Sequence, residues 1–172
     1  MDEGVKDYSV KAPSIKDVYQ NFWHIVTTFF GVGCITPAPG TWGSFVAWPV
    51  FVLLIGPLSS TVSWCIIFAT FVVGSVAISK SGPKLGKIDH GSIVIDEVVA
   101  VWIVLMIVPS SLLWQFIAVC LFRFFDIVKL PPASTVDSWA QNGWTVMLDD
   151  IIASIYVLLV MGGIIGVMQW IV

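Results

Sequence analysis

Charge is scarce in this sequence. Only 11% of its 172 residues are Asp, Glu, Lys or Arg, whereas a soluble globular domain carries about 25%. Hydrophobic residues make up 58% of the chain, and the mean hydropathy is +0.95. The scarcity of charge excludes an ordinary soluble domain. The nine tryptophans agree with this conclusion, because Trp favours the membrane–water interface.

Three further absences exclude other classes of protein. The net charge is -3 and there is no run of Lys or Arg, so we expect no nucleic-acid partner. The cysteines are odd in number and lack CxxC spacing, which excludes a disulfide framework or a zinc site. The first twenty residues are polar and include acids, so we expect no cleavable signal peptide.

Long uncharged stretches predict membrane spans. Residues 41–79 contain no charged side chain and, at about 20 residues a span, are long enough for two. A turn-forming run at 56–60 divides them into spans at 42–55 and 62–79. Residues 151–172 are uncharged and long enough for a final span.

Residues 98–122 allow two interpretations. They form either one span kinked at Pro109 or two short helices that turn there. The hairpin gives five spans and puts every Lys and Arg on one side, which the positive-inside rule makes cytoplasmic. We therefore favour the hairpin. Its first helix must start near Ile93 to cross, which draws Asp96 and Glu97 into the membrane boundary.

The N-terminal part is a polar tail followed by a short apolar segment. We assign residues 1–17 to the tail and 18–172 to a single membrane-embedded catalytic domain. Residues 18–32 are aromatic and too short for a span, so we predict an interfacial or re-entrant helix. The expected fold is an all-α polytopic membrane protein with about five spans.

Four clusters next to the expected spans carry the groups capable of chemistry. The first is the glycine- and proline-rich run at 31–44. It can offer backbone N–H groups and a helix N-terminus to an anion, with Thr41 and Ser44 as hydroxyl donors. The alternative is an ordinary turn into the membrane, in which Thr41 or Ser44 caps the helix.

The second cluster contains three carboxylates and a histidine: Asp89, His90, Asp96 and Glu97. Hard cations such as Mg²⁺ bind carboxylate oxygens, and Asp89 and Asp96 would share one face of a helix. The alternative is a solvated acidic helix start. Because ionisable groups at membrane depth are usually functional, we favour the metal site.

The third cluster is Arg123, Asp126 and Lys129, which a helix places along one stripe. The two cations suit a phosphate, with Asp126 orienting them or binding metal. The alternative is a self-paired ion stripe where the helix leaves the membrane.

The fourth cluster is the adjacent pair Asp149 and Asp150 at the start of the last span. Neighbouring acids repel unless they share a cation or a proton, and no basic residue lies near them in sequence. This favours metal binding over simple capping of a helix N-terminus.

In the five-span topology all four clusters face the same side of the membrane. Carboxylates for a metal, basic groups for an anion and membrane walls for a lipid tail together indicate phosphoryl chemistry on a lipid. Two alternatives are a small transporter or ion channel and a non-catalytic assembly subunit. Transport favours ionisable groups near the bilayer midplane and internal repeats, neither of which the sequence indicates.

Four short motifs, in this order, resemble the phosphatidylglycerophosphatase A family. They are TPAPGTWGS at 36–44, IVIDEVV at 93–99, FRFFDIVK at 122–129 and VMLDD at 146–150. The resemblance implies a magnesium-dependent enzyme of the bacterial inner membrane. Its substrate would be phosphatidylglycerophosphate, from which it removes the terminal phosphate to yield phosphatidylglycerol.

The resulting prediction is a multi-pass lipid phosphatase whose site faces the cytoplasm, with water or a carboxylate as nucleophile. Its oligomeric state is not predicted. We assign catalytic roles to Asp89, Asp96, Asp126 and Asp149, phosphate binding to Thr41, Ser44, His90, Arg123 and Lys129, and Mg²⁺ binding to Asp96, Glu97, Asp149 and Asp150.

Overall fold

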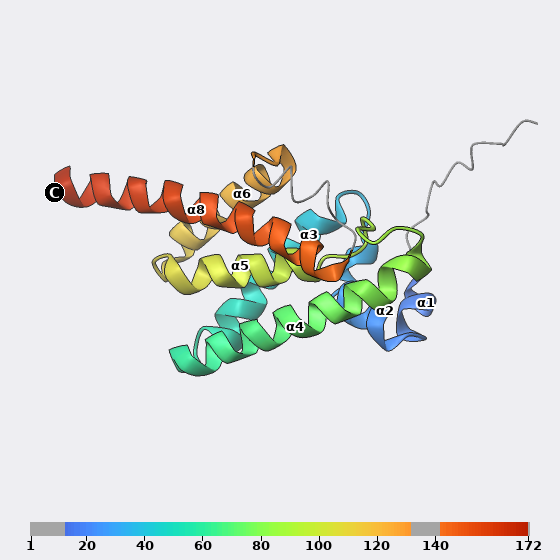
Figure 1. The fold of residues 1–172 in the computed structure, drawn as a ribbon. Coiled ribbons are helices and arrows are strands. Elements are labelled where there is room, and N and C mark those ends of the chain that lie inside the picture. The colour runs from blue at the N-terminus through green and yellow to red at the C-terminus, as the bar shows by residue number, and fades with distance from the viewer. Residues whose placement is uncertain (1–12, 132–141, 172) are drawn as a thin grey trace, which may run out of the picture.

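The computed structural model describes residues 13–131 and 142–171 of the chain, and every regular element in these ranges is a helix (Figure 1). The all-α prediction is therefore confirmed. In chain order the elements are α1 (Ile15–Tyr19), α2 (Phe22–Thr27), η1 (Val32–Cys34), α3 (Pro39–Val50), η2 (Phe51–Ile55), α4 (Ser60–Leu85), α5 (Ile95–Ile107), α6 (Leu112–Val128) and α8 (Gly143–Ile171).

Helix α5 forms the centre of the bundle and contacts α3, α4, α6 and α8. Its sequence is apolar on all sides, as expected for a helix that is surrounded by others. Residues 98–102 are each 5% exposed or less. The indole N–H of Trp102 donates a hydrogen bond to the carbonyl of Ala47 in α3, at 3.0 Å. Because α5 is central, the acids in its first turn are carried into the protein interior.

Within the described residues, two helices are long and apolar enough to cross a membrane. They are α4, of 26 residues with hydropathy 2.1, and the stretch Gly143–Trp170 of α8, with hydropathy 2.5. Helix α4 starts close to the expected position but continues to Leu85, through the charged residues Lys80 and Lys84. The continuous helix Pro39–Ile55 is apolar but shorter, and α5 and α6 have only 13 and 17 residues.

The break at Pro109 separates two helices. Helix α5 ends at Ile107, and Val108 is already extended, as expected for a residue that precedes proline. Helix α6 begins at Leu112, after Ser111 has accepted a hydrogen bond from the backbone N–H of Trp114. Residues 98–122 are thus two helices, as in the hairpin interpretation, and not one kinked helix.

The N-terminal apolar segment is not the single helix that we expected. It is divided into α1 and α2 because Asn21 takes an extended conformation and its side chain caps α2 through the N–H of Trp23. The predicted boundary at residue 17 falls inside α1. There Asp17 accepts hydrogen bonds from Ser14, which lower the pKa of the Asp17 carboxyl. Helix α2 packs on α4, where the hydroxyls of Thr27 and Ser81 lie 3.2 Å apart.

Candidate metal and phosphate site

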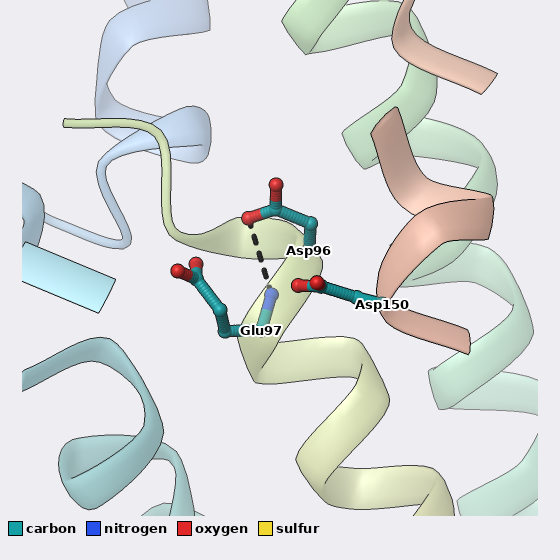
Figure 2. Close-up of side chains that lie close together, drawn as sticks. All are labelled: Asp96, Glu97 and Asp150. Carbon is teal, nitrogen blue, oxygen red and sulfur yellow. Dashed lines mark hydrogen bonds between the residues drawn. The ribbon is translucent and has the colours of Figure 1, made fainter. Parts of the chain in front are cut away.

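Three acidic side chains meet inside the bundle. Asp96 and Glu97 come from the first turn of α5, and Asp150 reaches them from α8 (Figure 2). One carboxylate oxygen of each lies within 4.8 Å of the others. The three residues are only 7%, 9% and 5% exposed. We call these residues the acidic trio.

The trio has unused bonding capacity. Asp96 Oδ1 accepts a hydrogen bond from the Glu97 N–H at 3.1 Å, but Glu97 Oε2 and Asp150 Oδ2 are buried without a hydrogen-bond partner. Buried carboxylate oxygens are costly unless a donor or a cation satisfies them. Three convergent carboxylates are ligands that a hard divalent cation prefers, so the residues present fit Mg²⁺.

A cavity of about 160 Å³ opens beside the trio. It lies where the start of α5, the end of α6 and the first turns of α8 come together. Its walls are Asp89, Gly91, Ile93, Asp96, Glu97, Asp126, Lys129, Val146, Asp149 and Asp150. Seven of the residues that we predicted for the site therefore face one cavity, although they come from four separate segments.

Asp89 lines this cavity from a turn, whereas we expected it to lie on a helix. The expectation that Asp89 and Asp96 share a helix face is wrong, because Gly86 ends α4 in a left-handed conformation and α5 starts only at Ile95. Asp89 therefore lies in the connecting turn. Its side chain is 32% exposed, and its carboxylate forms a long ion pair of 3.9 Å with Lys87.

Arg123 joins two segments of the site. Its Nη1 lies 2.7 Å from Asp126 Oδ2, the pairing along α6 that the self-paired interpretation predicted. The same Nη1 lies 3.4 Å from Glu97 Oε1 in α5. Arg123 therefore holds one member of the trio in addition to its own helix neighbour. Asp126 lines the cavity and Arg123 does not.

Lys129 and Asp149 form a second ion pair, with Lys129 Nζ 2.5 Å from Asp149 Oδ2. We expected Asp149 to be a metal ligand with no basic residue near it. The chain instead ends α6 at Lys129 in a left-handed conformation, which brings the lysine across to α8. Asp149 is not one of the three acids whose oxygens converge.

Three predicted phosphate ligands lie away from the cavity walls. Ser44 is buried inside α3, and its hydroxyl donates to the Gly40 carbonyl at 2.9 Å. Thr41 lies in the first turn of α3, which Ala38 caps, so neither hydroxyl residue is the N-cap. His90 Nδ1 lies 2.7 Å from the Ser92 hydroxyl and accepts the Ser92 N–H, so this histidine shapes the turn before α5.

Two contacts that position the site were not predicted. The N–H of Gly143 donates to Ser79 Oγ at 2.9 Å and fastens the start of α8 to α4. A Cβ atom at Gly143 would collide with the carbonyl of Ser75, so only glycine fits. Gly40 makes a similarly close approach to Glu97. The signal in the sequence was that Gly40 lies inside the motif at 36–44 and that Gly143 shortly precedes the motif at 146–150.

The fold and the site define a helical protein with candidate membrane-spanning helices and a buried acidic centre. The comparisons are more specific: the family described as Phosphatidylglycerophosphatase A matches residues 25–165. The chain belongs to this family and is a phosphatase.

Curated relatives agree on the class of enzyme. Phosphatidylglycerophosphatase A of Haemophilus influenzae is 42% identical over 139 residues, which cover 80% of this chain and 85% of the relative. The protein of that name from Escherichia coli is 32% identical over 141 residues, 78% of each chain. A Bacteroides thetaiotaomicron protein, provisionally named phosphatidylinositol-3-phosphatase, is 33% identical over 156 residues, 86% of this chain and 94% of the relative. No solved structure matches the chain.

Proposed function

We propose that this enzyme hydrolyses phosphatidylglycerophosphate to phosphatidylglycerol and inorganic phosphate, with Mg²⁺, at the cytoplasmic face of the bacterial inner membrane. The names of two relatives support the substrate. The observation that carries the chemistry is the acidic trio, because three buried carboxylates without enough donors need a cation.

Asp96, Glu97 and Asp150 would hold the magnesium. Their unpartnered oxygens, Glu97 Oε2 and Asp150 Oδ2, supply coordination that no side chain described in 13–131 and 142–171 uses. A bound Mg²⁺ supplies charge neutralisation for the phosphoryl oxygens. Asp149 Oδ2 lies 2.5 Å from Lys129 Nζ, so we assign Asp149 to positioning the lysine and not to binding the metal.

Lys129 supplies positive charge for the phosphate, and Arg123 supports the site indirectly. Lys129 lines the cavity directly, and Asp149 fixes its ammonium group. Arg123 acts from behind the cavity wall by orienting Asp126 and Glu97, to which it is paired. The cavity of about 160 Å³ accepts the phosphate end of the lipid, while the diacyl part stays among the apolar helices.

Asp89 is the residue best placed to accept a proton from an attacking water. Asp126 and Asp149 also line the cavity, but one oxygen of each, Oδ2, is held by Arg123 or by Lys129. Asp89 has the more exposed side chain. Water adds to phosphorus, the ester P–O bond to glycerol breaks, and the proton taken up by Asp89 is returned to the departing glycerol oxygen.

The charge distribution supports five crossings with the site inside. The start of α5, the end of α4 and the end of α6 lie toward the same end of the bundle (Figure 1). Lys80, Lys84, Arg123 and Lys129 belong to the latter two segments. The turns at 56–59 and 108–111, at the other end, carry no charge. The positive-inside rule then makes the basic end cytoplasmic.

A test of the substrate compares two phospholipids in mixed micelles. Purified enzyme receives phosphatidylglycerophosphate or phosphatidylinositol 3-phosphate at equal surface concentration, and released phosphate is measured. We expect kcat/KM for the glycerol lipid to be higher by at least about tenfold, about 1.4 kcal/mol. A preference for the inositol lipid would favour a substrate like the one in the name of the Bacteroides relative, and release from neither lipid would contradict the proposed substrate.

A further inference from the structure

Gly40, in the first turn of α3, lies against the ion pair that holds the acidic trio in place. The residue is buried. A Cβ atom added at Gly40 would collide with Glu97 Oε1 and would lie 3.1 Å from both terminal nitrogens of Arg123. Any side chain here therefore competes with the carboxylate and the guanidinium for the same space.

The local sequence brings the helix end to this point. Ala38 takes a left-handed conformation, with φ 60°, and Pro39 starts α3 directly after it. The positive end of the α3 dipole then faces Glu97, an arrangement that stabilises a carboxylate within the first helical turn. Glycine at the second helical position lets the carboxylate approach that closely.

We propose that Gly40 is a positioning residue for the metal site, an inference that rests on the proposed magnesium function. Its missing side chain fixes where the Glu97 carboxylate lies. Glu97 Oε1 lies between α3 and Arg123, 3.4 Å from Arg123 Nη1. The other carboxylate oxygen, Oε2, is left for the cation. Gly40 acts only through Glu97 and touches no substrate atom.

The carboxylate, and not the helix, should give way when a methyl group is added. Two hydrogen bonds of 3.0 Å fasten helix α3. The indole N–H of Trp102 donates to the Ala47 carbonyl, and the indole N–H of Trp48 donates to Gln115 Oε1. Glu97 Oε1 is the end of a flexible side chain. Gly40→Ala should therefore displace the Glu97 carboxylate while α3 remains docked.

The test measures Mg²⁺ binding to detergent-purified protein by titration calorimetry. We expect Gly40→Ala to weaken magnesium binding by at least about tenfold, the lower bound for loss of a supporting contact at a metal site. Gly43→Ala is the matched control, because its Cβ would also lie too close to a neighbour, 2.8 Å from the Cβ of Val94, but that neighbour is the apolar residue that precedes α5. We expect this control to change affinity by less than about threefold.

A double-mutant cycle with Glu97→Asp separates positioning from simple packing. The shorter side chain no longer reaches the space of the added methyl group. In the Glu97→Asp background, Gly40→Ala should then cost less than about threefold in magnesium affinity. If Gly40→Ala alone fails to fold, the double variant should fold and bind magnesium as Glu97→Asp does.

The outcomes distinguish the two proposals. If the natural protein binds magnesium and Gly40→Ala binds it equally well, the role of Gly40 is wrong and the metal site stands. The role of Gly40 is also wrong if Gly40→Ala weakens magnesium binding equally with and without Glu97→Asp, or if the double variant also fails to fold. If the natural protein binds no magnesium, both the proposed function and this inference fail.

Discussion

Lys129 Nζ lies 2.5 Å from Asp149 Oδ2, so the residue that ends α6 is tied to the second turn of α8. Adjacent positions on a helix point about 100° apart. Asp149 therefore faces the lysine, whereas Asp150 faces Asp96 and Glu97. Two carboxylates that are neighbours in sequence have different partners, and this difference leads to different predictions for the two.

Asp149→Asn should destabilise the protein without removing the metal. The change leaves the Lys129 ammonium, which is 31% exposed, without its carboxylate, at a cost of about 1–3 kcal/mol. We expect magnesium affinity to stay within about threefold of the natural value. Thermal unfolding and calorimetry of Asp149→Asn, Lys129→Gln and the double variant check this. Additive losses in the double variant would contradict the pairing.

Asp150→Asn should stabilise the metal-free protein. One of three crowded, buried carboxylates becomes neutral, which relieves repulsion. In EDTA we expect its unfolding midpoint to rise by roughly 2–8 °C, or about 1–2 kcal/mol. Excess magnesium should raise the midpoint of the natural protein and leave the variant unchanged.

Asp17→Asn removes the same charge from exposed α1 and should respond to magnesium as the natural protein does. A variant that is less stable in EDTA would speak against crowding in the trio.

Arg123→Lys should impair catalysis although the charge is kept. Both contacts, with Asp126 at 2.7 Å and Glu97 at 3.4 Å, are made by Nη1 of the guanidinium, and the shorter side chain of lysine does not bring its ammonium to the same point. We expect kcat/KM to fall by about 10- to 100-fold, the equivalent of one to two charged hydrogen bonds. Lys84→Arg, at the exposed end of α4, is the control. Equal activity of Arg123→Lys would show that only the charge matters at this position.

The topology predicts which turns face the cytoplasm. In a variant without native cysteines, a single cysteine is placed at Ser59 or at Lys87, both of which are exposed. A membrane-impermeant thiol reagent should label the first in intact spheroplasts and the second only after permeabilisation. The reverse pattern would place the site on the outer face, and labelling of both in intact cells would contradict an odd number of crossings between them.

Much of the fold could be predicted because helix breaks depend on local chemistry. Gly56 and Pro57 separate η2 from α4, and Pro109 separates α5 from α6, as the turn residues indicated. The end of α4 was placed too early because charged residues were taken to stop the span, whereas a helix can continue into water. The division of the N-terminal segment depended on one asparagine cap, which its apolar pattern concealed.

The site could be predicted as a set of charges but not as a set of pairs. The sequence identified the acids of the trio, because carboxylates at membrane depth require a partner. It could not show that Lys129 reaches Asp149, or that Arg123 reaches Glu97, because these contacts depend on how helices pack. The contact of Gly40 with Glu97 was hidden for the same reason, since a missing side chain leaves no pattern.

The most direct test of the account is phosphate release from phosphatidylglycerophosphate by the purified enzyme. Release is measured with magnesium, with EDTA, and for Asp150→Asn with excess magnesium. We predict release with magnesium, none in EDTA, and a loss of at least about 100-fold in the folded Asp150→Asn variant, because it removes a proposed metal ligand. Undiminished release in EDTA, or from Asp150→Asn, would contradict the claim that the acidic trio holds the metal for this reaction.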